Sequence, residues 1–208
     1  MRAEDAPQPT RRERQAAETR REIVVAARRL FTQHGYTPSS MARIAEQAGV
    51  SVQTIYDSVG SKAELVRRLN DLIDEEAEVG PIAARIPDAT SGVELVEIGV
   101  SISRNVTERC GDIIRATTLA AAAEPDLAEV VDDGRRRHVE GITHLCERLA
   151  TLGALRSNVS VEDAVEVWSA LTDHQVAMTF VDAYGWTYDR WQTWTVDMLA
   201  RLVLADAP

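Results

Sequence analysis

Apolar residues recur at the spacing of an α-helix from about residue 19 onwards. The first stripe occupies one face of a predicted helix that ends near Gly35, and it consists of Ile23, Ala27, Leu30 and Phe31. Residues 1–18 contain two prolines, several charges and few large apolar side chains, and they predict a flexible arginine-rich arm. No segment alternates apolar and polar residues with the period of a strand, so the predicted fold class is all-α.

Serines mark the starts of three further helices within the next thirty residues. Ser39 and Ser40 offer N-caps for a helix that ends at Gly49, because a serine hydroxyl accepts a hydrogen bond from a free backbone N–H. Ser51 caps a short third helix, and Ser61 begins an S-x-x-E capping box for a fourth helix over 62–76.

The second and third helices form a predicted helix-turn-helix at residues 41–59. We expect Val52, Ile55 and Val59 of the third helix to face inward. In this motif the second helix enters the major groove of DNA, while the first crosses the backbone. Two short helices joined at a glycine occur in many helical proteins, so the motif alone is weak evidence.

The rest of the chain predicts a larger helical body. After a link containing proline and glycine, helices are expected near 91–110, 112–123, 125–152, 160–183 and 187–204. The predicted organisation is an arm at 1–18, a helix-turn-helix DNA-binding domain at 19–66, and a ligand-binding and dimerisation domain at 67–208.

Charge is divided unevenly between these parts. Residues 1–70 hold 12 Arg/Lys and 8 Asp/Glu, a balance of +4, whereas residues 71–208 hold 11 and 25, a balance of −14. A basic N-terminal third on a chain of net charge −10 is typical of a small DNA-reading head on an acidic body. A basic arm alone would also raise the charge of this third, so composition does not decide between the two.

The stretch from Ile23 to Leu65 resembles the N-terminal domain of the tetracycline-repressor (TetR) family. The matching residues are Ala26-Ala27, Leu30-Phe31, Gly35-Tyr36, Ser39-Ser40, Ile44-Ala45, Ala48-Gly49-Val50-Ser51, Ile55-Tyr56 and Ser61-Lys62-Ala63-Glu64-Leu65. The resemblance implies a homodimeric regulator, taken to be a repressor, that binds a palindromic double-stranded DNA operator and leaves it when a small-molecule effector enters the body.

The resemblance also implies which side chains contact DNA. Ser40 and Tyr56 would bind phosphates, and Gln53 is the best candidate for direct readout because an amide can bond to adenine at two points. Lys62 would bind a phosphate at the start of the fourth helix. The full set expected at the DNA is Ser40, Ser51, Val52, Gln53, Thr54, Tyr56, Ser58 and Lys62.

Two features of this surface qualify the resemblance. Lys62 is the only lysine in the chain, which favours the phosphate role over that of a solvated surface residue. Asp57, Ser58 and Val59 stand where the family usually has aromatic or histidine residues, so the operator sequence does not carry over from relatives. Asp57 would weaken non-specific binding or accept from cytosine. The arginine-rich arm, with Arg11, Arg12 and Arg14, would either reach DNA or serve as a solubilising tail.

The resemblance places a small-molecule pocket in the helices of residues 91–181. Candidate polar and apolar liners are Arg115, Thr118, His138, His144, Trp168, Asp173, His174 and Met178, with Phe180 as further apolar wall; each is individually more typical of core or surface. Trp191, Trp194, Met198 and Leu202 form an apolar stripe that suits the dimer interface expected through the last two helices, although an intramolecular core would use the same residues.

Other functional classes find little support. No cofactor or metal site is expected, because His138, His144 and Cys146 do not share a helix face and no catalytic motif occurs. The absence of a long apolar run argues against a membrane span, and the charged N-terminus against a secretory signal, so a cytoplasmic, nucleoid-associated protein is expected. The alternatives are an all-α enzyme or small-molecule carrier with a vestigial DNA-binding head, and an architectural DNA binder.

Overall fold

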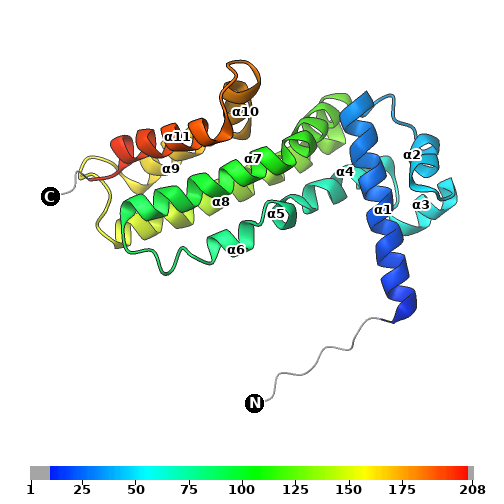
Figure 1. Ribbon diagram of the computed structural model, residues 1–208, viewed down its shortest axis with the longest axis horizontal. Coiled ribbons are helices and arrows are strands. Elements are labelled where there is room, and N and C mark those ends of the chain that lie inside the picture. The colour runs from blue at the N-terminus through cyan, green and yellow to red at the C-terminus, as the bar shows by residue number, and fades with distance from the viewer. Residues whose placement is uncertain (1–9, 206–208) are drawn as a thin grey trace, which may run out of the picture.

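Long helices dominate the computed structural model, which describes residues 10–205 (Figure 1). Within this range the only extended pairing is an isolated antiparallel bridge between Leu155 and Leu204, so the predicted all-α class is confirmed. The helices are α1 (Arg11–His34), α2 (Met41–Ala48), α3 (Val52–Ser58), α4 (Lys62–Asp71), α5 (Ile73–Glu76), α6 (Val79–Ala83), α7 (Gly92–Ala123), the 3-10 helix η1 (Pro125–Leu127), α8 (Ala128–Thr151), α9 (Val161–Leu171), α10 (His174–Asp182) and α11 (Tyr188–Val203).

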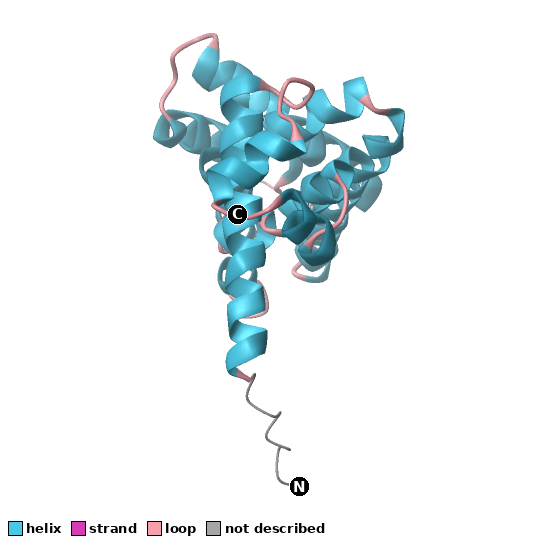
Figure 2. Cartoon of the chain, turned by 90° about the vertical axis from the view of Figure 1, so that its right-hand side faces the viewer, coloured by secondary structure: helices cyan, strands magenta, loops and turns pink. Residues whose placement is uncertain are grey.

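Helix α1 begins at Arg11, so the prediction of a flexible arm through residue 18 is wrong for residues 11–18. Thr10 caps the helix by accepting from the Glu13 backbone N–H, and the Glu13 carboxylate accepts from the Thr10 N–H in return. The cap supports a helical turn that has no apolar stripe. Arg11, Arg12 and Arg14 are exposed on this part of α1, which projects away from the other helices (Figure 2). The remainder of the predicted arm, residues 1–9, lies outside the described residues.

Two predicted helix boundaries in the body are also wrong. Helix α7 continues through Gly111, where a break was expected, and α10 packs beside it; a Cβ at this glycine would lie 3.6 Å from Met178 Sδ, an ordinary van der Waals distance. The expected helix over 160–183 is instead broken after Leu171 into α9 and α10. The Asp173 side chain caps α10 by accepting from the backbone N–H groups of Gln175 and Val176.

Two hydrophobic cores lie at opposite ends of α7. One joins α1–α5 to α7 from Val106 onwards, including Ile113 and Ala120. The other joins the first half of α7 to α8, α9 and α11. The head therefore packs directly on a helix of the body, and the core is continuous across residue 66. The division into domains at 19–66 and 67–208 stays a prediction.

Arg28 of α1 fixes the head to α7 at the edge of the first core. Its guanidinium donates to both carboxylate oxygens of Asp112, at 2.6 and 2.7 Å, to Glu76 of α5 at 2.5 Å, and to the Arg109 carbonyl at 2.9 Å. Burial alone would raise the pKa of Asp112, but the hydrogen bonds and charge of Arg28 lower it. Bidentate, partly buried pairing of this kind orients the two helices as well as attracting them.

A pair of glycines on α7 and α8 tests how tightly the second core is packed. A Cβ at Gly99 would come within 2.5 Å of Trp168 Cζ2 and 2.6 Å of Leu145 Cδ1, whereas a Cβ at Gly141 meets nothing within 4 Å. We expect Gly99→Ala to lower the free energy of unfolding by about 1–3 kcal/mol through overpacking. Gly141→Ala, the matched control, should raise it by up to about 1 kcal/mol. Urea unfolding of both variants measures this, and a neutral or stabilising Gly99→Ala would contradict the packing described.

Candidate DNA-binding surface and ligand cavity

Helices α2 and α3 are short because a capped start and a glycine-containing turn bound each of them. The Ser40 side chain accepts from the Arg43 N–H and the Ser51 side chain from the Thr54 N–H. Gly49 between them adopts φ +69°, a left-handed conformation that favours glycine. Ile44 and Ile55 are fully buried beneath the two helices, which leaves the opposite face of α3 outward.

The outward face of α3 carries most of the residues expected to contact DNA. Ser40, Ser51, Val52, Gln53 and Tyr56 are exposed, while Thr54, Ser58 and Lys62 are partly buried. The expectation that Val52 faces inward is wrong: its side chain is 36% exposed, because it stands in the first turn of α3, beyond the edge of the core that holds Ile55. The DNA contacts themselves stay predictions.

Gln53 and Asp57 form a hydrogen-bonded pair one turn apart on α3. Gln53 Nε2 donates to Asp57 Oδ1 at 2.8 Å, both side chains being exposed. This bond uses one of the two amide protons and leaves the second proton and the carbonyl oxygen of Gln53 free. Those two groups are the donor and acceptor that bidentate recognition of adenine needs. Asp57 therefore orients the amide without blocking it.

Lys62, at the start of α4, lies against the aromatic ring of Tyr36. Its Nζ is 3.9 Å from the ring centroid and 3.4 Å from the Thr37 carbonyl oxygen. Burial lowers the pKa of Lys62 from its usual value, against the opposing effect of the negative charge of Glu124. The ring positions the ammonium group at the N-terminus of α4, where the helix dipole also attracts an anion.

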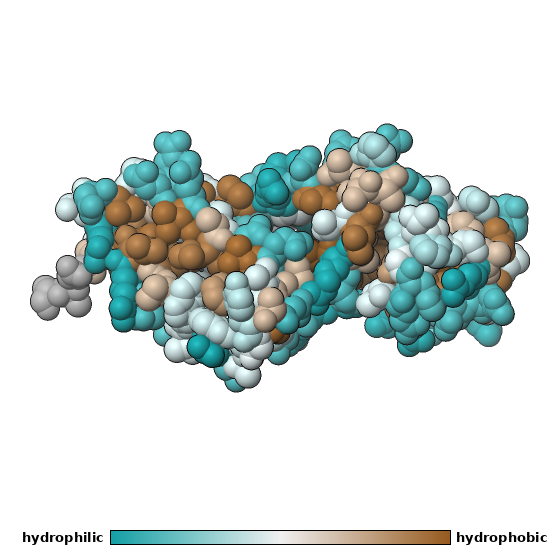
Figure 3. Space-filling model, turned by 90° about the horizontal axis from the view of Figure 1, so that it is seen from above, coloured by the Kyte–Doolittle hydropathy of each residue, from teal (hydrophilic) through white to brown (hydrophobic). Residues whose placement is uncertain are grey.

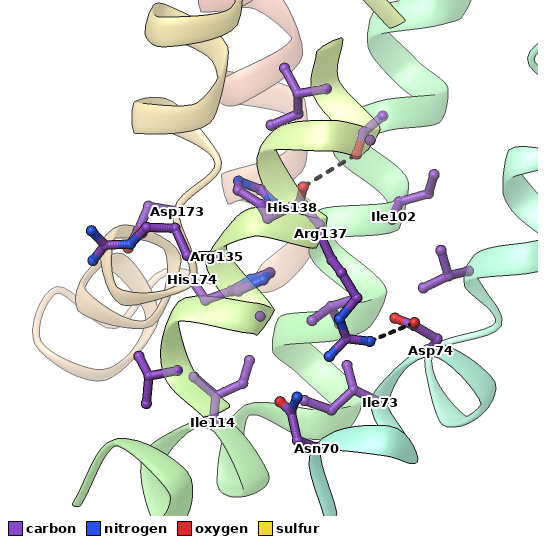
Figure 4. A pocket seen from close by; sticks show the side chains of 18 of the residues that line it. Asn70, Ile73, Asp74, Ile102, Ile114, Arg135, Arg137, His138, Asp173 and His174 are labelled. Carbon is purple, nitrogen blue, oxygen red and sulfur yellow. Dashed lines mark hydrogen bonds and ion pairs between the residues drawn. The ribbon is translucent and has the colours of Figure 1, made fainter. Parts of the chain in front are cut away.

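A cavity of about 310 Å³ lies in the body, between α4–α6 on one side and α7, α8 and α10 on the other. Figure 4 shows Asn70 and Asp74, which come from α4 and α5, and His138 and His174, which come from α8 and α10. Most of the wall is aliphatic; its larger apolar residues are Ile73, Val79, Ile86, Ile102, Val106, Ile114, Val130, Val131, Ile142 and Leu145.

The eight residues predicted to bind a ligand divide into two groups. Thr118, His138, His144, Asp173 and His174 line the cavity, although a ligand role for them stays a prediction. The prediction that Arg115, Trp168 and Met178 line it is wrong, because tertiary packing turns each of them elsewhere. Arg115 is exposed and pairs with Asp182, Trp168 is fully buried in the second core, and Met178 is buried against α7 near Gly111.

The apolar wall expected from Phe180 is also absent from the cavity. Phe180 packs against Trp186 and Trp194, with ring centroids 4.6 and 5.1 Å apart.

Seven polar liners were not predicted from the sequence: Asn70, Asp74, Ser103, Thr117, Arg135, Arg137 and Gln175. Arg137 of α8 donates to Asp74 of α5 at 2.7 Å across the cavity wall (Figure 4). Asn70 interrupts the apolar stripe of α4 and is buried. That interruption is the one signal in the sequence that could have identified it.

His138 of α8 and His174 of α10 lie next to each other on the cavity wall. Their ring centroids are 5.1 Å apart. Burial, together with the nearby His138, lowers the pKa of His174 to about 4, against the weaker attraction of Asp173. Burial also lowers the pKa of His138. Both rings are therefore neutral at pH 7.

Comparison with known proteins identifies the head. Residues 23–69 match the family described as bacterial regulatory proteins, tetR family. The matched range begins in α1 and ends in α4, so it covers the whole helix-turn-helix and Lys62. Over these residues the chain matches the TetR family. The resemblance inferred from the sequence is confirmed.

Two regulators share sequence with this chain over different lengths. The HTH-type transcriptional regulator TtgR of Pseudomonas putida is 43% identical over 65 residues, which are 31% of each chain. The alignment thus spans about a third of TtgR. The uncharacterized HTH-type transcriptional regulator YdeS of Bacillus subtilis is 27% identical over 154 residues, which are 72% of this chain and 73% of YdeS.

The fold of the chain also has a solved counterpart. The structure of the SmeT–triclosan complex superposes with a TM-score of 0.73 at 18% identity, over 91% of this chain and 93% of the SmeT chain. At this identity the likeness concerns the fold. None of the helices within residues 10–205 combines the length and apolar composition that a bilayer span needs.

The lowered pKa of His174 predicts a pH dependence of stability. As the pH falls, the unfolded chain takes up this proton near pH 6.5 and the folded chain only near pH 4, so the contribution is complete above pH 6.5 and is lost on the way down to pH 4. His174→Gln should remove roughly 2–3 kcal/mol of the difference in unfolding free energy between pH 7.5 and pH 4.5. Urea unfolding at both pH values measures it. His144→Gln on the same cavity wall should behave like the native chain, and a His174→Gln variant with the native pH dependence would refute the assignment.

Proposed function

We propose that this protein is a ligand-responsive transcriptional regulator, acting as a repressor, which binds a palindromic DNA operator as a homodimer. One observation carries the proposal: an exposed helix-turn-helix reading face is joined through α4 and α5 to the wall of a cavity of about 310 Å³. Such a protein reads DNA with one end and senses a small molecule in the body, and it works in the cytoplasm with the nucleoid. The SmeT–triclosan complex supports small-molecule binding by a protein of this fold.

A homodimer would form through the end of the body that carries α9 and α11. Figure 3 shows apolar surface gathered at this end of the molecule, on the left as in Figure 1. Val167 of α9 and Leu202 of α11 are 36% and 48% exposed. The stripe expected from sequence contributes only in part, because Trp191 is fully buried in the intramolecular core. Two heads about 34 Å apart would then meet successive major grooves.

The cavity wall supplies the coupling between ligand and DNA. Asn70 and Asp74 belong to the helices that continue from the head, and Arg137 belongs to α8 of the body. A ligand that spreads these walls would move α4, and with it α3. The two α3 helices of the dimer would then no longer match the spacing of the operator half-sites. Release follows if the ligand prefers that arrangement of the helices.

Duplex binding at several salt concentrations tests the proposal against its alternatives. A palindrome-containing DNA fragment, taken from the region upstream of the gene for this protein, should bind tightly at low salt. It should bind more tightly than DNA of unrelated sequence. An enzyme or carrier with a vestigial head predicts no salt-dependent binding. An architectural binder predicts a salt slope without sequence preference and no release by ligands. Either outcome would overturn the proposed regulator.

Lys62 should contribute one phosphate contact. We expect Lys62→Met, which keeps an apolar stem over Tyr36, to weaken binding of all sequences alike and to reduce the slope of log K against log salt by about one. Arg68→Met removes an exposed cation from the same helix and is the matched control, with an unchanged slope. Fluorescence anisotropy across a salt series measures both slopes. Equal slopes in the two variants would show that Lys62 does not contact a phosphate.

Gln53 should read a base, with Asp57 holding its amide. Gln53→Ala should weaken the free energy of binding to the preferred operator by roughly 1–3 kcal/mol and change binding to random DNA little. Asp57→Ala should reduce the free energy of operator binding by less. It should also reduce the preference in binding free energy for adenine over other bases at the contacted position, because the Gln53 amide becomes free to turn. Binding to operators with single-base changes measures these effects. Unaltered specificity in Gln53→Ala would show that another residue reads the base.

A further inference from the structure

The hydrogen bonds around His174 define which ring nitrogen carries its proton. His174 Nδ1 lies 3.0 Å from the hydroxyl oxygen of Thr107 on α7. The Thr107 hydroxyl donates its single proton to the Ser103 carbonyl oxygen at 2.8 Å. Its oxygen can therefore only accept from His174, so the proton of the neutral ring is on Nδ1. This assignment leaves Nε2 with an unshared electron pair.

The Nε2 atom of His174 has no hydrogen-bond partner among the described residues, and its ring lines the cavity. The neighbouring His138 is engaged more fully within the protein. Its Nε2 lies 3.3 Å from the Thr172 hydroxyl oxygen, and a hydrogen bond with the Ser169 backbone opposes the lowering of its pKa by burial. His174 is therefore the ring of the pair that is placed to accept a hydrogen bond from a ligand.

Hydroxyl groups on the cavity wall have likewise used their protons within the protein. Ser103 donates to the Gly99 carbonyl, and Thr117 and Thr118 donate to the Ile114 carbonyl. Each oxygen retains only lone pairs for a ligand. The amide side chains of Asn70 and Gln175 can both donate and accept, so they impose no preference. The hydroxyl groups and the free nitrogen of His174 thus all favour a ligand that donates.

Charged groups on the wall balance one another. The carboxylates of Asp74 and Asp173 are matched by the guanidinium groups of Arg135 and Arg137, and Arg137 is paired with Asp74 at 2.7 Å. An ionised ligand would lose its hydration on entering an aliphatic cavity without meeting an excess of opposite charge. The lining therefore favours an uncharged molecule.

We propose that the effector is an uncharged, largely apolar molecule whose hydroxyl or N–H group donates a hydrogen bond to Nε2 of His174. This inference rests on the proposed function, since it names the chemical class that the sensing cavity takes. The volume of about 310 Å³ suits a body of one to three rings or a comparable aliphatic skeleton. A buried acceptor left unpaired makes a ligand without a donor bind more weakly.

Three probes of one shape test the donor requirement: 4-phenylphenol, its methyl ether 4-methoxybiphenyl, and the anion 4-phenylbenzoate. Calorimetric titration of the DNA-free protein at about pH 7.5 should show the phenol binding at least about tenfold more tightly than either of the others. The ether keeps the oxygen and the ring system but has no proton to donate. Equal or tighter binding of the ether or the benzoate would overturn the proposal, as would the absence of binding by all three.

Two substitutions assign the preference to His174. His174→Phe keeps a flat ring without the acceptor and should bring the phenol-to-ether ratio close to one. Thr107→Val removes the partner that fixes the proton on Nδ1 and should lower the ratio less. His34→Phe, on the exposed end of α1 outside the cavity, should keep the native ratio. A native ratio in both cavity variants would show that another group accepts the bond.

Failure of this inference is distinguishable from failure of the proposed regulator. The regulator is tested by operator binding without any probe, and the donor preference by titration without DNA. Operator binding combined with no preference for the phenol overturns only the ligand class. Preference for the phenol without operator binding overturns only the regulator.

Discussion

Helix α7 belongs to both hydrophobic cores, and this shared packing constrains every other part of the molecule. Its residues from Val106 onwards, including Ile113 and Ala120, pack against the head, and its earlier residues pack against α8, α9 and α11. Arg28 adds a directional tie between the head and Asp112 of α7. A close-packed interior transmits displacement instead of absorbing it, so a shift of the helices around the cavity is carried to α1 and the reading surface.

The cavity interrupts that packing between the helices that continue from the head and those of the body. Its wall includes helices that continue from the head and helices of the body, and one ion pair, Asp74–Arg137, joins them directly. On the proposed function, a ligand there would compete with contacts between the head and the body. Most of the polar side chains on the wall already have a partner within the protein, because a buried polar atom without one is costly.

Local signals in the sequence defined the head well and the cavity poorly. The serine caps and glycine turns of α2 and α3 act through neighbouring residues, so Ser40, Ser51 and Gly49 could be recognised directly. The start of α1 was missed because Thr10 and Glu13 cap a turn that carries no apolar stripe. The cavity brings together residues from six helices, and which face of α7 or α10 meets it depends on tertiary packing. Trp168 and Met178 are therefore buried in the core instead of lining the cavity, and Asn70 and Arg137 line it although the sequence did not predict this. The tautomer of His174 depends on Thr107, 67 positions away.

Lys62 also determines how this surface reacts with reagents that modify amines. As the only lysine, it is the sole side-chain primary amine in the whole protein. Acylating reagents and acetylating enzymes that act on lysine have one target here, and it stands at the start of α4 beside the recognition helix. The Tyr36 ring, 3.9 Å away, covers one side of that amine. A single acylation would thus neutralise the head's one side-chain ammonium group and leave its arginines untouched.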